Sequence, residues 1–324
     1  MSKNSNTVEN IPLVSVSIIT YNHENYIGQA IDSVLMQKVD FPYEIIIGDD
    51  NSKDKTREVL KAYKKQYPNI IQLILHPIDY DDIPGRTNNT TNLLNCSGKY
   101  IAMLDGDDFW NSPDKLQKQV DFLEKNPEYS LTFHQTDMLK SGGIIEPYEK
   151  LKSQLGSGDR SFSKMEVIRE WFIQTSSMVY RNHFKTEFPD WFWQVYSADY
   201  ALQMMAMQYG KAMFFEDIKM TRRYHDTSFT RTKTLKHTEM RTKEMLVFGQ
   251  YFKPFASLRS RQLAKYFFRK SSREINQFYG KTWSKNFLSF LKYFWVYLVF
   301  QERTFGNRKK YYKYLRWRTK TFGI

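Results

Sequence analysis

Three carboxylates within four positions, Asp105, Asp107 and Asp108, are the residues of this sequence whose types and spacing most clearly suggest chemistry. They follow the apolar run 100–104, which suits a buried strand and is too short for a typical helix. Like charges this close repel one another unless a cation or a hydrogen-bonded ligand offsets them. Such oxygens suit Mg²⁺ or Mn²⁺, which bind through one or two carboxylates plus substrate phosphates. An Asp-Gly turn in a solvated loop is the alternative.

Two other polar clusters follow predicted strands in the same way. Thr20–Asn25 ends the β-branched run 13–20, and Asp49–Ser52 follows the apolar run 43–48. Because the carboxyl ends of parallel strands meet at one edge of a sheet, we expect the three clusters to line one crevice of nucleotide size. The first loop has no G-x-G-x-x-G, and the sequence has no G-x-x-x-x-G-K-[ST]. A dinucleotide site or a P-loop is therefore disfavoured.

The elements that must position these clusters alternate between strand and helix, which predicts an α/β fold with a doubly wound, mainly parallel sheet. Helix N-caps are predicted at Ser52 and Ser197, and loops over 76–92 and, as a surface or lid loop, over 140–159. A short helix is expected just before Gly98. The other predicted strands are 70–75, 99–104, 129–139, 176–180, 211–215 and 218–224, and the other predicted helices are 26–37, 53–67, 112–126, 165–173 and 198–210.

Composition limits the class of protein. A length of 324 residues suggests one large domain with an appendage, and 41% hydrophobic residues supply ample core. The single cysteine, Cys96, excludes an intramolecular disulfide and fits a reducing compartment. Residues 1–12 form a polar, flexible stretch that lacks the apolar region of a secretory signal. We therefore expect a cytoplasmic protein.

Positive charge is concentrated toward the C-terminus. Residues 218–324 hold 26 of the 48 Lys and Arg residues but only 5 of the 35 Asp and Glu residues. The apolar run 287–300, about 21 Å long as a helix, is shorter than a bilayer core of about 30 Å. With the basic, aromatic-rich segment 308–320, it favours an interfacial helix on anionic lipid. Packing on the catalytic domain or on a second subunit is the alternative, and nucleic acid is a disfavoured third.

A resemblance to a known family emerges from four segments taken together. Val16–Asn22, Glu44–Ser52 with Asp54 and Thr56, Gly98–Ile101 and Asp105–Asp108 occur in an order and spacing that resembles the family 2 inverting glycosyltransferases of GT-A fold. The resemblance is close over 13–125 and looser to about 230. It implies a metal-dependent transfer of a sugar from a nucleotide sugar to an acceptor hydroxyl, with inversion at the anomeric carbon.

The resemblance assigns the nucleoside to the first two loops. Thr20 and Tyr21 would flank the nucleobase, where an aromatic ring suits stacking. Asp49 or Asp50 would accept a hydrogen bond from the base, which fits the N–H of uracil and hence a UDP-sugar. Without the resemblance, Tyr21 is equally well a packed ring, and Asp49 a residue of a helix-capping turn.

The resemblance assigns the diphosphate to the third loop, Asp105–Asp108. By resemblance, Asp105 would contact the ribose, Asp107 would bind Mn²⁺ or Mg²⁺ across the diphosphate, and Asp108 would support that ligand from behind. Residues 222–225 resemble the segment that supplies a histidine to the metal in some relatives, which makes His225 a second candidate ligand, since a neutral imidazole can complete such a site. An isolated histidine is more often structural.

The base that deprotonates the acceptor hydroxyl is expected among the later carboxylates. The family places it at the start of a helix after the lid region, and Asp199 has that context. The dipeptide Glu216–Asp217 is a less favoured rival because it lies between two predicted short strands. The helix dipole alone would also favour Asp199 in a first turn. Arg86 is displaced from the family's usual arginine; a solvated loop arginine is the favoured prediction there, and contact with the diphosphate is the alternative.

These observations predict a hexosyl or N-acetylhexosaminyl transferase that builds surface polysaccharide or lipid-linked glycan at the inner face of the plasma membrane. The expected domain spans 13–232, with a nucleotide-sugar half (13–125) and an acceptor half (126–232). A helical, basic C-terminal region (233–324) follows. The alternatives are a nucleotidyltransferase of the same fold, which would not need Asp199, and a non-catalytic scaffold that binds membrane or nucleic acid. The sugar, linkage, acceptor and oligomeric state are left open.

Overall fold

The computed structural model divides into two compact units. Unit 1 holds residues 1–167, 171–192 and 198–231, and unit 2 holds residues 168–170, 193–197 and 232–324. The residues that the structure describes are 11–78, 85–140, 142–148, 155–169, 172–184, 187–224, 244, 247–248 and 251.

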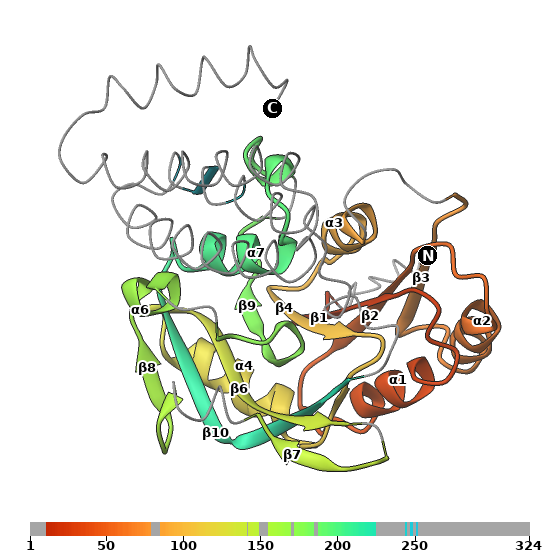
Figure 1. Ribbon diagram of the computed structural model, residues 1–324, viewed down its shortest axis with the longest axis horizontal. Coiled ribbons are helices and arrows are strands. Elements are labelled where there is room, and N and C mark those ends of the chain that lie inside the picture. The colour runs from red at the N-terminus through yellow and green to blue at the C-terminus, as the bar shows by residue number, and fades with distance from the viewer. Residues whose placement is uncertain are drawn as a thin grey trace, which may run out of the picture. The chain divides into compact units, whose positions relative to one another are not determined.

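Within the described residues, ten strands form one sheet in unit 1, in the order β3-β2-β1-β4-β9-β6-β10-β5, with β7 beside β6 and β8 beside β10 (Figure 1). The first four are parallel, whereas β9 runs antiparallel to both β4 and β6. The bounds are β1 Val14–Thr20, β2 Tyr43–Asp49, β3 Ile71–Leu75, β4 Tyr100–Asp105, β5 Phe109–Trp110, β6 Tyr129–Leu139, β7 Ile145–Pro147, β8 Arg160–Phe162, β9 Val179–Arg181 and β10 Lys211–Arg223.

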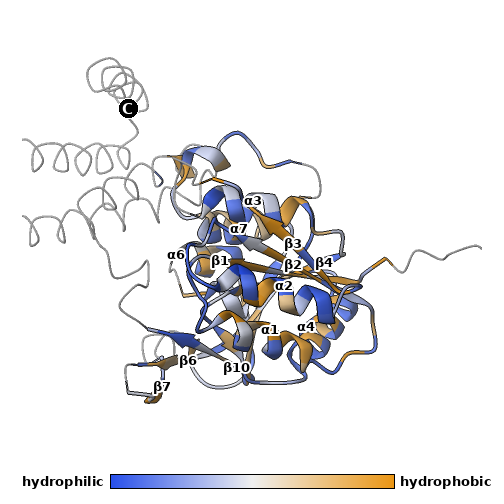
Figure 2. Cartoon of the chain, turned by 90° about the vertical axis from the view of Figure 1, so that its right-hand side faces the viewer, coloured by the Kyte–Doolittle hydropathy of each residue, from blue (hydrophilic) through white to orange (hydrophobic). Residues whose placement is uncertain are grey.

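Helices cover both faces of this sheet. Figure 2 shows α1, α2 and α4 on one side of the strands and α3 and α7 on the other. The arrangement confirms the predicted α/β class with a largely parallel central sheet. The bounds are α1 Ile27–Leu35, α2 Thr56–Gln66, α3 Arg86–Leu94, α4 Lys115–Lys125, α6 Lys164–Arg169 and α7 Ala198–Ala206, with single 3₁₀ turns η1 Thr175–Ser177 and η2 Phe192–Gln194.

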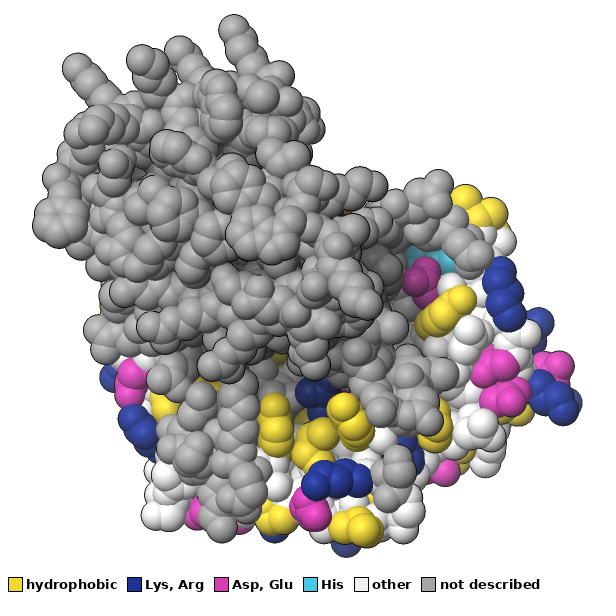
Figure 3. Space-filling model, viewed as in Figure 1, with side chains coloured by type: hydrophobic (Ala, Val, Ile, Leu, Met, Phe, Trp, Pro, Cys, Tyr) yellow, Lys and Arg dark blue, Asp and Glu magenta, His cyan; other side chains and the backbone are white. Residues whose placement is uncertain are grey.

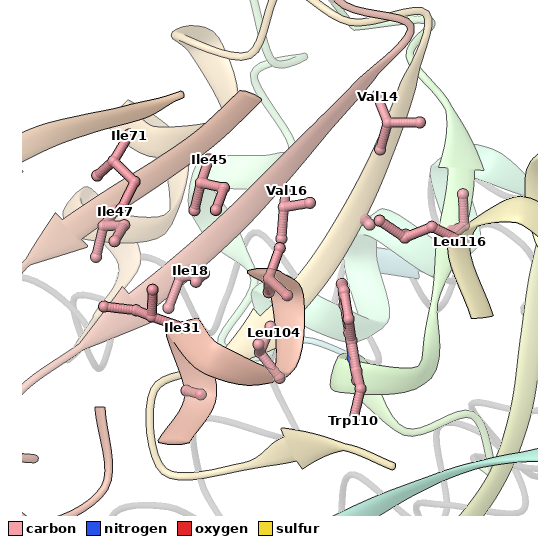
Figure 4. Packing of buried hydrophobic residues seen from close by; sticks show 14 of the residues in the cluster. Val14, Val16, Ile18, Ile31, Ile45, Ile47, Ile71, Leu104, Trp110 and Leu116 are labelled. Atoms are coloured by element: carbon pink, nitrogen blue, oxygen red, sulfur yellow. The ribbon is translucent and has the colours of Figure 1, made fainter. Parts of the chain in front are cut away.

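The two faces of β1 are chemically different. Val14, Val16 and Ile18 point to one side and pack with Ile31 of α1 and Ile45 of β2, all of them fully buried (Figure 4). Alternation along a strand places these side chains on one face. Burying each aliphatic side chain contributes about 1.5–3 kcal/mol, so this layer is a main source of stability for the edge that carries the polar loops.

The opposite face of β1 is polar and is covered by the amide-rich helix α3. Nδ2 of Asn92 lies 2.9 Å from Oγ of Ser17 and 3.0 Å from the carbonyl oxygen of Ile18. Asn88 donates to the carbonyl of Gly48 at 2.9 Å. A Cβ at Gly48 would lie 2.1 Å from Oδ1 of Asn88, so only glycine lets the helix approach this strand.

Helix α3 corrects the prediction of a loop over 76–92. The helix begins at Arg86 and ends at Leu94, so a helix does precede Gly98, but it lies mostly within the segment that was predicted to be a loop. The predicted N-cap at Ser52 was also wrong: α2 begins at Thr56, and the Ser52 hydroxyl instead accepts a hydrogen bond from the backbone N–H of Asn22.

Later elements differ more from the predictions. The strand expected over 176–180 is the 3₁₀ turn η1 followed by β9. The two short strands expected over 211–224 form the single strand β10, whose pairing with β6 shifts register between Phe215 and Lys219. Part of the expected loop over 140–159 contains strand β7, and β5 was not predicted.

Most of the predicted basic region, 233–324, lies outside the described residues, and the apolar run 287–300 lies wholly outside them. In the part of the chain that is described, no helix is long and apolar enough to cross a bilayer. On the described surface that Figure 3 shows, Lys and Arg side chains lie beside Asp and Glu side chains.

Candidate active site

The three polar clusters that were predicted to converge lie at one edge of the sheet. Thr20 at the end of β1 is in register with Asp49 at the end of β2, and Ile19 is in register with Asp105 at the end of β4. The backbone N–H of Gly106 donates to the carbonyl of Ile19 at 2.8 Å. The parallel register therefore brings residues from three loops onto adjacent strand ends, the usual ligand edge of an open α/β sheet.

The first two loops are tied to each other by hydrogen bonds. Asn22 donates its backbone N–H to the Ser52 hydroxyl at 2.9 Å and accepts the backbone N–H of Lys53 on its side-chain oxygen at 2.8 Å. Asn22 and Asn51 adopt positive φ angles of 54° and 61°. Asparagine tolerates this left-handed region better than most residues, which explains why asparagine stands at both bends.

Asp49 is fully buried between these loops. Its Oδ2 accepts from the Arg57 side chain and, at 3.1 Å, from the backbone N–H of Ser52. Its Oδ1 has no hydrogen-bond partner in the described structure. A buried acceptor without a donor is costly, so a ligand N–H that reached this oxygen would gain a hydrogen bond. The ring of Tyr21 is 47% exposed and is available for stacking.

The third loop, the acidic loop Asp105–Asp108, concentrates negative charge. Burial, together with the neighbouring charges of Asp107 and Asp199, raises the pKa of Asp105 to about 7, although the charge of Arg222 opposes this shift. Burial raises the pKa of Asp108 well above its usual range, and the charges of Asp107 and Asp105 add to this shift. Carboxylates whose charged forms are disfavoured in this way are stabilised when a cation approaches.

The residues of this loop form a suitable donor set for a metal bound together with a phosphate. Among the described residues, no three His, Cys, Asp or Glu side chains gather into a cage of protein ligands. Mg²⁺ and Mn²⁺ in phosphate sites need only one or two carboxylates, because the phosphates and water complete the shell. Asp107 is partly buried at the loop apex and meets that requirement. The second predicted ligand, His225, lies outside the described residues.

The 3₁₀ turn η1 contacts this loop from behind. Ser176 donates its hydroxyl to Oδ2 of Asp108 at 2.8 Å and accepts the backbone N–H of Asp105 at 3.0 Å. The indole N–H of Trp110 donates to the Ser176 carbonyl at 2.7 Å. Asp108, predicted to support the metal ligand, is thus held by a residue that sequence reasoning treated only as part of a strand.

Asp199 lies in the first turn of α7, as predicted, and is partly buried. Its Oδ1 accepts the backbone N–H of Tyr200 at 2.8 Å, and its Oδ2 accepts the hydroxyl of Thr175 at 3.3 Å. Its charge acts on Asp105, so the predicted base and the acidic loop lie near each other. Arg222 donates a 2.9 Å hydrogen bond to the side-chain oxygen of Gln174, the residue just before η1.

The rival carboxylates are engaged elsewhere. Asp217 forms an ion pair with Lys118, and Glu216 accepts the backbone N–H of Gly158 at 2.6 Å. Both lie where β10 shifts register against β6, not at a strand end beside Asp105. This geometry favours Asp199 over Asp217 as the carboxylate that serves the acidic loop.

Two further observations revise the site predicted from the sequence. Arg86 is 7% exposed, which contradicts the prediction of a solvated loop arginine. Oγ1 of Thr20 lies 3.2 Å from Nδ1 of His23, and a Cβ at Gly106 would lie 2.8 Å from that hydroxyl oxygen. The first and third loops therefore touch at a glycine whose role the Asp-Gly-Asp pattern alone did not show.

Comparison with known proteins shows what this part of the chain is similar to. Residues 15–148 match the family model described as glycosyl transferase family 2. An uncharacterised protein of Mycobacterium tuberculosis is 35% identical over 170 residues, which cover 52% of this chain and 46% of that protein. TuaG of Bacillus subtilis, named provisionally as a glycosyltransferase of teichuronic acid biosynthesis, is 37% identical over 123 residues, or 37% of this chain and 46% of that protein. The chain thus spans about half the length of these curated relatives.

Solved structures show the same fold. S. aureus TarS, residues 1–349 in complex with UDP-GlcNAc, superposes with a TM-score of 0.61 at 18% identity, covering 86% of this chain and 79% of that one. The mannosyltransferase PcManGT of Pyrobaculum calidifontis, in complex with GDP-Man and Mn²⁺, gives 0.58 at 15% identity, covering 93% and 84%.

Proposed function

We propose that the protein is an inverting glycosyltransferase that moves a sugar from a nucleotide sugar to an acceptor hydroxyl, because residues 15–148 match the model of glycosyl transferase family 2. The observation that carries this proposal is the position of Asp199 beside the acidic loop. The loops after β1 and β2, with the partly exposed Tyr21, lie at the same edge of the sheet. A donor half and a base therefore share one strand edge.

The nucleoside would lie against the first two loops. Tyr21 stacks on the base, since its ring is partly exposed at the end of β1. Oδ1 of Asp49 accepts an N–H of the base, which uracil supplies, and Thr20 and Asp50 lie beside the base. The solved complexes of TarS with UDP-GlcNAc and of PcManGT with GDP-Man support a nucleotide-sugar donor, and the Asp49 acceptor fits the N–H of uracil in a UDP-sugar.

The diphosphate would lie against the third loop. Asp107, with His225 as a second ligand, would hold Mn²⁺ or Mg²⁺, which offsets negative charge on the departing diphosphate. Asp105 faces the ribose, and Asp108 fixes the loop through Ser176. Asp199 accepts the proton of the attacking acceptor hydroxyl, so one displacement inverts the anomeric carbon without a covalent enzyme intermediate.

The acceptor is proposed to be a glycan or lipid-linked glycan at an anionic membrane surface. The relative TuaG supports polysaccharide synthesis, and the basic composition of 218–324 supports attraction to anionic lipid. Deleting 281–324 should then reduce binding to phosphatidylglycerol-containing liposomes while UDP binding persists. Liposome binding that is unchanged by the deletion would overturn the membrane proposal.

A thermal-shift screen of UDP- and GDP-sugars with and without Mn²⁺ tests the donor. A ligand at one hundred times its Kd stabilises the native state by about 2.7 kcal/mol, which gives a measurable rise in Tm. We expect a shift with UDP-sugars that depends on Mn²⁺. No shift with any nucleotide would favour the scaffold alternative.

Asp199→Asn tests the chemistry, with Asp217→Asn as the matched control. Loss of the general base should lower turnover by about 100-fold or more with little change in nucleotide affinity. The control removes a carboxylate that pairs with Lys118 and should keep turnover within two-fold. Normal glycosyl transfer by Asp199→Asn would overturn the assignment of Asp199 as the base.

A further inference from the structure

We propose that Thr175 and Ser176 are positioning residues that hold the base Asp199 and the metal-side carboxylate Asp108 on one rigid turn, η1. The inference rests on the proposed function, because it concerns how the two halves of that site are kept in register. Neither hydroxyl is part of the acidic pattern, and each contacts a different half of the site.

Ser176 connects the turn to the acidic loop at several points. Its hydroxyl both donates to Asp108 and accepts the backbone N–H of Asp105, so one oxygen contacts both ends of the Asp-Gly-Asp-Asp segment. Ser176 is 1% exposed, and the bond from Trp110 fixes its carbonyl. A change at this hydroxyl therefore changes the conformation of the loop that carries Asp107.

Thr175 connects the same turn to the base. Its hydroxyl lies 3.3 Å from Oδ2 of Asp199, while the helix backbone holds Oδ1 through the N–H of Tyr200. At 3.3 Å this O–H···O contact is longer than the usual 2.5–3.0 Å range, so it is a weak bond that orients the carboxylate. A base needs such a fixed direction toward the hydroxyl from which it takes a proton.

The rest of the turn is bonded to helix α4 and, through Gln174, to the positive charge of Arg222. Gln119 of α4 donates to the carbonyl of Ser177 at 3.1 Å, and Ser177 donates its hydroxyl to the carbonyl of Gln174 at 2.7 Å. Arg222, whose charge lowers the pKa of Asp105, bonds the Gln174 side chain. The turn thus links base, acidic loop and guanidinium through consecutive residues.

Such a link matters because inversion requires the base and the anomeric carbon to be aligned across the acceptor oxygen. A misplacement of about 1 Å can cost roughly 100-fold in rate. Partners that orient a metal ligand typically contribute roughly 10–100-fold in affinity or activity. Loss of either hydroxyl should therefore affect function more than its small volume affects folding.

The Ser176 half is tested by binding alone, without an acceptor. We expect Ser176→Ala to raise the Kd of UDP, measured by calorimetry with Mn²⁺ present, by about 10-fold. The Kd without Mn²⁺ should stay within two-fold, because the first two loops are untouched. Ser177→Ala is the matched control: its hydroxyl bonds only within the turn, so both Kd values should stay near those of the wild type.

The Thr175 half is tested by turnover. With the nucleotide sugar selected by the thermal-shift screen, Thr175→Val should lower kcat about 10-fold, with an unchanged Kd for UDP and Mn²⁺. Thr175→Ser restores the hydroxyl and should recover most of the rate. Circular dichroism and Tm verify that each variant is folded, and the serine variant keeps the test open if the valine variant is not.

The possible failures are distinguishable. A wild-type protein without nucleotide binding would overturn the proposed function itself. Normal binding by the wild type, with Ser176→Ala and Thr175→Val indistinguishable from it, would overturn only the positioning role. An equal loss of nucleotide affinity in Ser177→Ala would also overturn the positioning role. It would show that an intact turn is enough and that the Ser176 hydroxyl has no specific effect.

Discussion

The two sides of the site are built on different principles. On the nucleobase side, the loops after β1 and β2 hold each other in place, with Asn22, Ser52 and Lys53 joined by backbone and side-chain hydrogen bonds. On the carboxylate side, Asp105 and Asp108 carry pKa values raised by burial and by the charge of Asp107. One side is preformed, and the other is electrostatically incomplete until a cation and a diphosphate arrive.

This difference implies a division of labour. The nucleobase side can select the base without a metal, because stacking and one hydrogen bond need no charge compensation. The carboxylate side contributes binding free energy only when its negative charge is neutralised, so it should govern the metal dependence of nucleotide binding. A stability cost on that side is the expected counterpart of its function.

Removing Asp107 should have the largest effect. Asp107→Asn deletes the charge that would hold the metal and should raise the Kd of UDP in Mn²⁺ by about 100-fold, with little change in metal-free buffer. Calorimetry with and without Mn²⁺ measures both values. An equal loss in the two buffers would contradict the assignment of Asp107 to the metal.

Tyr21→Ala is the counterpart on the nucleobase side. Base–aromatic stacking is worth about 1–3 kcal/mol, so the Kd of UDP should rise roughly 10-fold, and by the same factor whether Mn²⁺ is present or not. Asp107→Asn and Tyr21→Ala should then add in the double variant. A stacking loss that appeared only with Mn²⁺ would break the proposed separation of the two sides.

Relieving repulsion should stabilise the metal-free protein. The pKa of Asp105 is raised to about 7, above its unfolded value of about 3.9, so its contribution to stability is present at low pH and lost as pH rises through about 7. Asp105→Asn should raise the free energy of unfolding by roughly 1–3 kcal/mol at pH 8 and by less at pH 5.

Urea denaturation in chelating buffer measures this difference. Asp217→Asn is the control, since its carboxylate pairs with Lys118 at the surface and should change stability by less than about 1 kcal/mol. A gain in Asp105→Asn that was the same at both pH values would show that the Asp105 pKa is not raised in the folded state.

The sequence predicted the nucleobase side better than the carboxylate side, because the patterns that determine the nucleobase side are local in the sequence. Strands β1, β2 and β4 and the loops after them were predicted closely, because apolar runs and turn residues are local signals. The parallel register then placed Asp49 and Asp105 beside β1 without further information. The nucleobase side needs only these local patterns.

Helix α3 was missed for a chemical reason. Its buried residues are polar except for Leu93, and Asn88 and Asn92 among them bond the strand backbone, so the helix has no apolar periodicity to detect. The turn η1 was missed for a topological reason. Ser176 and Asp108 are 68 positions apart, and nothing local in Thr-Ser-Ser indicates that partnership. The carboxylate side is assembled by such distant contacts.

The smallest predicted effect lies behind the carboxylate side, at Lys115. This residue is fully buried at the start of α4, its Nζ lies 3.9 Å from the ring centroid of Trp110, and that amine has no hydrogen-bond partner in the described structure. Burial lowers the pKa of Lys115 well below its usual range. The unfolded chain, with a lysine pKa of about 10.4, therefore binds more protons than the folded protein between the two pKa values, and stability rises with pH across that window.

Lys115→Met keeps the volume and removes the amine. We therefore expect the free energy of unfolding, measured by urea denaturation, to rise by about 1–2 kcal/mol at pH 7 and by less toward pH 9.5. An unchanged pH slope in Lys115→Met would show that the amine is not the source, and the cost of the carboxylate side would then lie in its acidic residues alone.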